Sequence, residues 1–210
     1  MHSTYLKRVQ ENILSISVAD TLPKAFKEWY VTGKTIDHEK PVETCQLCEH
    51  EALRYRYEIQ NQDTGYTLWV GSKCILQFDI AVYEGDKVLD KSSAQRKLNT
   101  LIKEQRFESC LKALHRVAEK EKNNILNDAL KFYRKHKYLT PKQAFVVIWR
   151  LQENQIDYSP SFFKVNLRKE QYRVDLRAMP SHRVHMIWPA LSSNQRKLAI
   201  KLGHPEPDNT

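Results

Sequence analysis

Glycine is scarce in this chain, with 5 residues among 210, and no apolar run approaches the roughly 18 residues that a membrane-spanning helix needs. The scarcity of glycine, beside recurrent leucine, lysine, glutamate, glutamine and arginine, favours a mainly helical protein. No secretory pattern of an apolar core followed by small residues is present at the N-terminus. We therefore expect a cytoplasmic protein with no membrane partner.

Several catalytic signatures are also missing. The chain has no glycine-rich phosphate loop, no Gly-x-Ser-x-Gly and no His-Glu-x-x-His. Its acidic residues are scattered beside lysines, whereas a two-metal nuclease needs clustered carboxylates. These absences favour a binding protein. An enzyme that acts on nucleic acid through a site assembled from distant residues stays open as the third interpretation.

The positive charge is concentrated at one end of the chain. The net charge is +9, and residues 131–210 hold 15 Lys and Arg against 6 Asp and Glu, while residues 1–130 hold 19 of each kind. A localised basic surface suits a polyanionic partner, because each neutralised phosphate releases counterions. Nucleic acid, either DNA or RNA and including single strands, is the partner that this pattern favours. A solvated basic face without a partner and a membrane surface are the alternatives.

Three of the four cysteines follow the spacing of a small metal site. Cys45 and Cys48 form a Cys-x2-Cys pair, and Cys74 follows a stretch with a β-hairpin pattern. Structural zinc sites typically have two thiolates in a tight turn and a third thiolate that a β-hairpin brings back beside them. In a reducing compartment such cysteines are metal ligands or thiols more often than disulfides. A redox role is disfavoured, because no βαβ pattern surrounds the pair.

The fourth ligand is less obvious. A treble clef or zinc ribbon would place it three residues after Cys74, where Gln77 stands. His50 is the first candidate, with His38 and Cys110 as alternatives. If they are not metal ligands, His50 is an ordinary exposed histidine and Cys110 is a buried thiol on a helix. We predict a structural Zn²⁺ held by Cys45, Cys48, Cys74 and His50.

The chain divides by pattern into three segments. Residues 1–40 read as two short helices, the second with Trp29 and Tyr30 on one side and Gly33 as its stop. Residues 41–80 read as a zinc-finger-like hairpin with strands over 54–60 and 66–70 and a turn at Gly65. Residues 81–210 read as a helical basic region, in which Thr140 and Ser192 begin helices. The predicted fold is therefore mainly α with a small zinc-stabilised β-hairpin (α+β), a treble-clef-like finger followed by a helical C-terminal region.

The segment 44–78 resembles one found in uncharacterised proteins of bacteria, plasmids and phages. The shared pattern begins Cys-x-Leu-Cys-x-His, continues with Thr-Gly at the hairpin turn and ends Val-Gly-Ser-x-Cys-Ile-x-x-Phe; here its metal-ligand types are Cys45, Cys48, His50 and Cys74. The resemblance implies a zinc-finger-like module in a bacterial or mobile-element protein and carries no established activity.

Cations alternate with aromatic residues in the C-terminal segment. Cations can bind a phosphate backbone and exposed rings can stack on bases, although Tyr133 and Tyr172 also fit a helical core. The predicted nucleic-acid-binding residues are Lys131, Arg134, Lys135, Lys137, Arg168, Lys169, Arg173 and Arg177, with Arg54, Arg56 and Lys73 in the hairpin segment. We expect a zinc-binding, nucleic-acid-binding accessory protein. The alternative is a module that binds a host or mobile-element protein.

Overall fold

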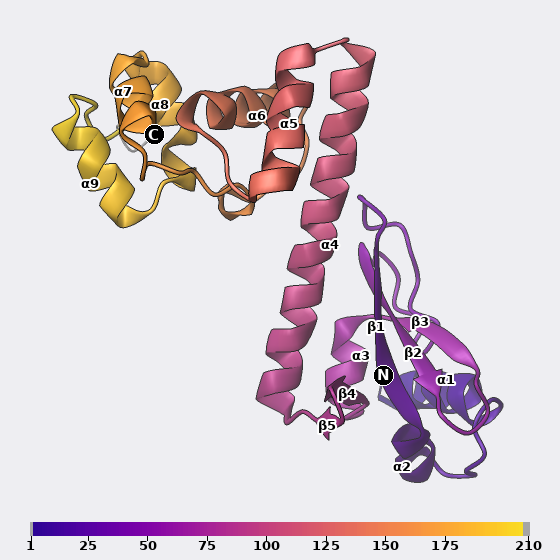
Figure 1. Ribbon diagram of the computed structural model, residues 1–210. Helices are drawn as coiled ribbons and strands as arrows, with labels where there is room; N and C mark the ends of the chain where they lie inside the picture. The colour runs from indigo at the N-terminus through magenta and orange to yellow at the C-terminus, as the bar shows by residue number, and fades with distance from the viewer. Residues whose placement is uncertain (1, 208–210) are drawn as a thin grey trace. The chain divides into compact units, whose positions relative to one another are not determined.

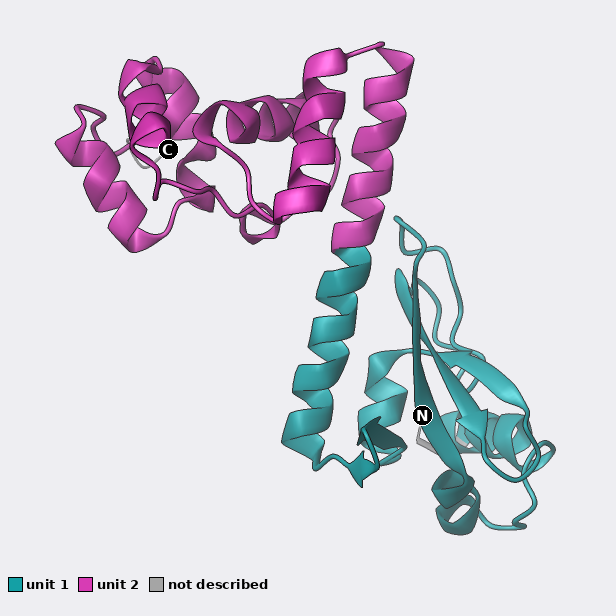
Figure 2. Cartoon of the chain, viewed as in Figure 1, with its two compact units in different colours: residues 1–106 teal, residues 107–210 magenta. Residues whose placement is uncertain are grey.

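The computed structural model describes residues 2–207 and divides the chain into two compact units, unit 1 (residues 1–106) and unit 2 (residues 107–210), shown in Figures 1 and 2. Each unit has its own hydrophobic core. Helix α4 (Lys91–Lys120) begins in unit 1 and ends in unit 2. No helix among residues 2–207 is long and apolar enough to cross a membrane.

Unit 1 is built on a mixed five-stranded sheet in the order β3-β2-β1-β4-β5. Its elements are α1 (His2–Leu14), α2 (Leu22–Ala25), η1 (Phe26–Glu28), β1 (Trp29–Asp37), β2 (Tyr55–Asn61), β3 (Thr67–Val70), α3 (Ser72–Gln77), β4 (Ala81–Glu84) and β5 (Lys87–Val88). Strand β1 pairs antiparallel with β2 and parallel with β4. Trp29, Tyr57 and Leu98 are fully buried in the core of this unit.

The second helix predicted for residues 1–40 is wrong from Trp29 onward. After α2 and η1 the chain enters β1, where buried Trp29 and Val31 alternate with half-buried Tyr30, the two-residue period of a strand. Gly33 has a φ of 88° where the pairing register between β1 and β2 shifts. The aromatic and β-branched run suits a pleated surface, and pairing with β2 outweighs its weak helical pattern.

The predicted hairpin is confirmed as strands β2 and β3, which pair antiparallel. The side-chain oxygen of Asn61 accepts hydrogen bonds from the backbone N–H groups of Asp63 and Thr64 at 2.8 and 2.9 Å, and Gly65 takes a φ of 75°. The hairpin does not stand alone, however, because β1, β4 and β5 extend it into the larger sheet. Unit 1 is therefore an α+β structure with more sheet than the sequence predicted.

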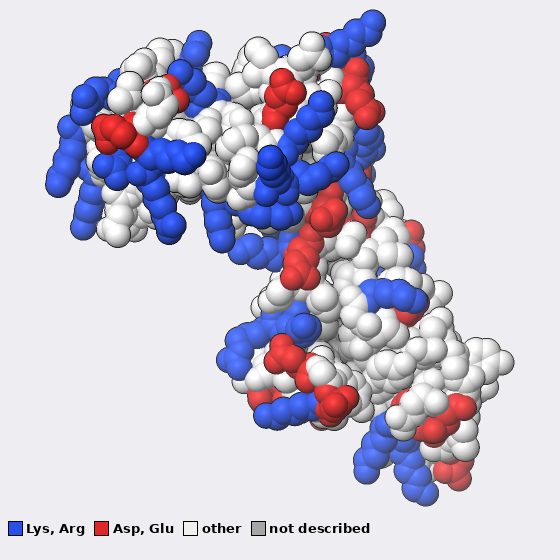
Figure 3. All heavy atoms as spheres, viewed as in Figure 1, with Lys and Arg blue, Asp and Glu red and all other residues white. Residues whose placement is uncertain are grey.

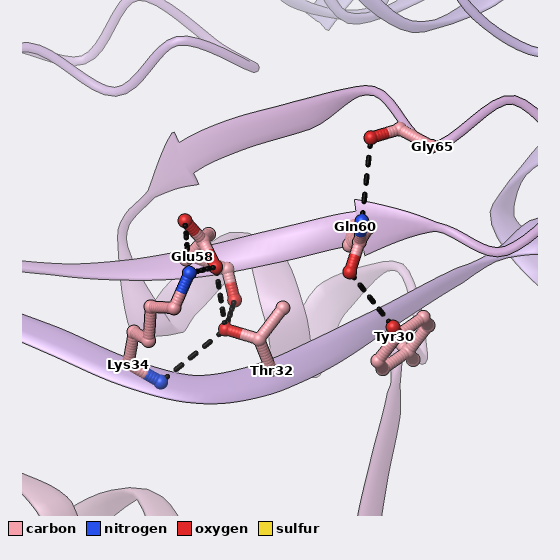
Figure 4. A network of polar contacts seen from close by, with 6 residues as sticks. All are labelled: Tyr30, Thr32, Lys34, Glu58, Gln60 and Gly65. Carbon is pink, nitrogen blue, oxygen red and sulfur yellow. Dashed lines mark hydrogen bonds and ion pairs between the residues drawn. The ribbon is translucent and has the colours of Figure 1, made fainter.

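Polar pairs across β1 and β2 fix the register of the sheet (Figure 4). The buried carboxylate of Glu58 accepts a hydrogen bond from Thr32 Oγ1 and pairs with Lys34 Nζ, both at 2.9 Å. Tyr30 donates to Gln60 Oε1 at 2.8 Å. A slip of one residue would break these pairs and move each side chain to the opposite face of the sheet.

Unit 2 is helical, as predicted for most of residues 81–210. The prediction is wrong for Ala81–Glu84 and Lys87–Val88, which form β4 and β5 because they pair with β1 and with each other in the sheet of unit 1. Besides the end of α4 it contains α5 (Asn124–His136), α6 (Pro141–Glu153), η2 (Pro160–Phe162), α7 (Glu170–Ala178), α8 (Ser181–Ile187), η3 (Trp188–Ala190) and α9 (Ser193–Lys201). Thr140 and Ser192 begin α6 and α9 with capping boxes that involve Gln143 and Gln195. Both caps were predicted from the sequence.

Candidate metal centre and nucleic-acid interface

The three predicted cysteine ligands lie together in unit 1. Cys45 and Cys48 belong to the loop before β2 and Cys74 to α3, and all three side chains are buried. The Sγ atom of Cys74 is 3.7 Å from that of Cys45 and 3.3 Å from that of Cys48, and all three lie within 4.8 Å of one another. Tetrahedral zinc with Zn–S bonds of about 2.3 Å places its sulfur atoms about 3.8 Å apart. The group is therefore compatible with a metal such as zinc.

The loop that carries Cys45 and Cys48 is held on several sides. Within the loop, the N–H of Glu49 donates to the carbonyl of Cys45 at 2.8 Å. Gln46 joins the loop to β3, because its N–H donates to the carbonyl of Trp69 at 3.0 Å and its side chain accepts from the N–H of Trp69 at 2.6 Å. From α1, Asn12 Nδ2 donates to the carbonyl of Leu47 at 3.2 Å. These contacts help to position the two sulfur atoms of the loop.

Backbone N–H groups point at two of the sulfur atoms. Leu47, Cys48 and Gly71 donate to Cys45, and His50 donates to Cys48. Gly71 suits its position because a Cβ there would lie 3.3 Å from a methyl group of Leu53. Such N–H groups favour the thiolate form, which is the form that binds a metal.

The three thiols influence one another strongly. The hydrogen bond with the Cys74 thiol, helped by backbone N–H groups and opposed by burial, lowers the pKa of Cys45 to about 5. The same hydrogen bond and burial raise the pKa of Cys74 far above its ordinary value, while burial raises the pKa of Cys48. A metal that binds all three residues as thiolates must therefore release protons.

The structure does not bring a fourth predicted ligand into the group. Among the described residues only the three cysteines form it. His38 Nε2 accepts from Arg56 Nε at 3.2 Å and its Nδ1 lies 3.5 Å from a carboxylate oxygen of Glu43, so both of its ring nitrogens have other partners. Cys110 is buried in the core of unit 2. His50 is exposed and borders the same pocket as the cysteines, and its role as a ligand stays a prediction.

A pocket of about 800 Å³ in unit 1 borders all three cysteines. Tyr5 also lines it, with its hydroxyl 4.0 Å from Cys74 Sγ and donating to Gln77 Oε1 at 3.1 Å. Burial is the main cause that raises the pKa of Tyr5, with a further contribution from Cys74. Tyr5 could not be predicted from the sequence, because its separation of 69 residues from Cys74 leaves no local signal.

The net charge of the chain lies entirely on unit 2. Residues 107–210 hold 19 Lys and Arg against 10 Asp and Glu, whereas residues 1–106 hold 15 of each kind. On the face drawn in Figure 3, Lys and Arg side chains predominate over unit 2. A pocket of about 360 Å³ in unit 2, named here the basic groove, is lined by Lys137, Tyr138, Lys164, Val165, Asn166, Leu167, Arg168 and Gln195.

Backbone pairing brings the two sides of the basic groove together. The N–H of Leu139 donates to the carbonyl of Lys164 at 2.8 Å, and the N–H of Asn166 donates to the carbonyl of Leu139 at 2.9 Å. Gln195 Nε2 donates to the carbonyl of Val165 at 2.7 Å and so holds the same segment from α9. Lys137 and Lys164, which are 27 positions apart in the chain, therefore line one groove.

Aromatic rings lie beside these cations. The Tyr138 ring contacts Phe132 and His136, with ring centroids 5.6 and 5.7 Å apart. The Lys169 ammonium lies 5.6 Å from the ring centroid of Tyr172, and Tyr172 shares a hydrogen bond with Tyr138. Cations and aromatic rings thus occur together, as the sequence pattern suggested.

The other predicted cations have different surroundings. In unit 1, Arg54 binds Asp37 through two hydrogen bonds of 2.8 and 3.0 Å, and Arg56 lies 3.0 Å from a carboxylate oxygen of Glu43. Lys73 is exposed and lines the pocket beside the cysteines. In unit 2, Arg173 donates to the carbonyl of Leu167 at 2.9 Å, Arg134 lies 3.3 Å from His115 and Lys131 lies 3.9 Å from Asp128, while Lys135 and Arg177 are exposed.

Comparisons with known proteins do not assign the chain to a family. No protein-family model matches it, and no curated protein and no solved structure matches it either. The three buried cysteines are the part of the described motif that the structure supports.

Proposed function

We propose that this chain is a zinc-stabilised accessory protein that binds nucleic acid through unit 2. The observation that carries the proposal is the concentration of the whole net charge of +9 on unit 2, with Lys137, Lys164 and Arg168 in one groove beside aromatic rings. Such cations can neutralise phosphates, and rings such as that of Tyr138 can stack on bases. DNA and RNA are both candidate partners.

The zinc part of the proposal rests on Cys45, Cys48 and Cys74. We infer that Zn²⁺ joins the loop before β2 to α3, in a treble-clef-like arrangement of knuckle, hairpin and short helix embedded in the sheet of unit 1. Four cysteines without a disulfide fit a reducing compartment, and we propose the cytoplasm. The bacterial or mobile-element origin that the resemblance implies stays a prediction.

A salt titration of the 210-residue chain tests the proposed function. Fluorescence anisotropy with labelled single-stranded and duplex oligonucleotides should give affinities that fall steeply as salt rises, with a slope of about −0.7 to −0.9 per neutralised phosphate on logarithmic axes. Absence of binding to DNA and RNA at low ionic strength would rule the function out. The protein-interaction alternative then gains support if the chain forms a stable complex with a partner protein.

A further inference from the structure

We propose that a metal held by Cys45, Cys48 and Cys74 keeps its fourth coordination position open to the adjoining pocket and binds a small anionic thiol there. The inference rests on the metal site of the proposed function and is independent of nucleic-acid binding. Structural zinc sites are normally closed by four protein ligands, whereas a site with three protein ligands leaves one position for an exchangeable ligand.

No side chain near the sulfur atoms supplies the fourth donor. The group within metal-binding reach consists of the three cysteines alone among residues 2–207. The backbone of His50 is fixed, since its N–H donates to Cys48 Sγ and its carbonyl accepts from the N–H of Cys45 at 2.9 Å, while its side chain is exposed. The hydroxyl of Tyr5, 4.0 Å from Cys74 Sγ, is engaged with Gln77.

The space for a ligand lies directly beside the sulfur atoms. The pocket of about 800 Å³ borders all three cysteines and lies within unit 1. Its volume falls in the range of about 300–1,000 Å³ that is usual for small-molecule sites. A ligand that enters this pocket therefore comes next to the three cysteines.

The charges on the pocket wall nearly balance, and Lys73 is the cation that lies next to a metal ligand in the chain. Arg8 is paired with Glu49 at 3.3 Å and Arg54 with Asp37 at 2.8 Å, so these cations are largely balanced. The exposed ammonium of Lys73 lies on the same wall, although Glu51 adds an opposing carboxylate there. Lys73 is the neighbour of Cys74 in the chain and is the group that we assign to an anionic substituent of the ligand.

The donor set narrows the chemical class of the ligand. A metal already bound by soft thiolates accepts another sulfur donor well, and Lys73 suits a carboxylate. A small thiol that carries a carboxylate meets both requirements. Mercaptoacetate is the simplest probe of this class, with 2-mercaptoethanol as the sulfur-only control and acetate as the carboxylate-only control.

The experiment uses the 210-residue chain with Co²⁺ in place of zinc, because thiolate-to-cobalt charge-transfer bands report the number of sulfur ligands. Mercaptoacetate should raise this absorption saturably by about one third, as three sulfur ligands become four, while cobalt stays bound. Acetate should leave the band intensity unchanged. Lys73→Ala should weaken mercaptoacetate binding by about threefold without changing cobalt content or the response to 2-mercaptoethanol.

Two results would overturn the inference. One is an unchanged spectrum at saturating mercaptoacetate. The other is a loss of metal affinity of about tenfold or more in His50→Ala, which would identify His50 as the fourth ligand. If the wild-type protein binds one metal ion per chain, either result leaves the proposed function standing. If the wild-type protein binds no metal, both this inference and the proposed structural zinc are overturned. The salt titration tests nucleic-acid binding separately.

Discussion

The Sγ atoms of Cys45 and Cys74 lie 3.7 Å apart, although 29 positions separate these residues in the chain. The hairpin of β2 and β3 makes this approach possible, because its return strand ends next to Gly71, whose N–H points at the sulfur of Cys45. An ion bound here would cross-link the loop before β2 to α3. Loss of the ion should therefore weaken unit 1.

Replacement of a cysteine ligand should remove the metal and destabilise the protein. We expect Cys45→Ser to lower zinc content from one per chain to near zero and the free energy of unfolding by about 4 kcal/mol or more, as is typical when a structural metal is lost. Metal analysis and urea unfolding measure the two effects. Cys110→Ala is the matched control, since Cys110 lies in the core of unit 2, and it should keep its zinc. Full zinc content in Cys45→Ser would contradict the site.

Loss of cations from the basic groove should reduce the salt dependence of nucleic-acid binding. Lys137→Ala and Arg168→Ala should each weaken binding and reduce the slope of log affinity against log salt by about 1, because one phosphate contact disappears. Lys40→Ala, an exposed lysine of the neutral unit 1, is the control and should bind as wild type. Equal slopes in all four proteins would place the binding surface elsewhere.

A pH-dependent contribution to stability is expected from Glu28. Burial raises the pKa of this carboxyl, but hydrogen bonds from Asn61 Nδ2 at 2.7 Å and from the N–H groups of Val18 and Ala19 at 2.9 and 2.7 Å outweigh it and hold the pKa below its ordinary value near 4.5. A lowered folded-state pKa stabilises the protein fully above the unfolded-state value, and this stabilisation is lost as pH falls through the lowered value.

Glu28→Gln should therefore cost about 2 kcal/mol at pH 7, and the difference from wild type should shrink below pH 4.5. Urea unfolding between pH 7 and pH 4 measures the difference in the free energy of unfolding between wild type and Glu28→Gln. Any contribution of a bound metal is the same in both proteins and cancels. Glu51→Gln, at an exposed position, should track wild type throughout. A difference that is constant over this range would show that the charge of Glu28 does not act through these bonds.

The cap of α6 should contribute measurably to the stability of unit 2. The Thr140 hydroxyl accepts from the N–H of Gln143 at 3.3 Å, while the Gln143 side chain accepts from the N–H of Thr140 at 3.1 Å. Thr140→Ala should lower the free energy of unfolding by about 1 kcal/mol, because the helix N-terminus loses this partner. Thr140→Ser retains the hydroxyl and should stay close to wild type in the same thermal or urea unfolding experiment.

Local patterns predicted the parts of the fold that depend on a few neighbouring residues. The turn at Gly65 and the helix starts at Thr140 and Ser192 follow from turn and capping chemistry, which acts over three or four positions. Strand β1 was mistaken for a helix, because Trp29 and Tyr30 also fit a helical spacing. Their pairing with Asn61 and Gln60 of β2 decides the outcome, and that partner lies about 30 positions away.

The same division applies to the functional sites. The spacing of the cysteines, the hairpin between them and the concentration of positive charge toward the C-terminus can be read from the order of the residues. Folding is needed to bring the three sulfur atoms together beside a pocket that Tyr5 also borders, to place Lys137 and Lys164 in one groove, and to set Arg54 and Arg56 against carboxylates. The physical reason is range: caps and turns depend on bonds between near neighbours, whereas a pocket or an ion pair depends on strand register and packing across the whole unit.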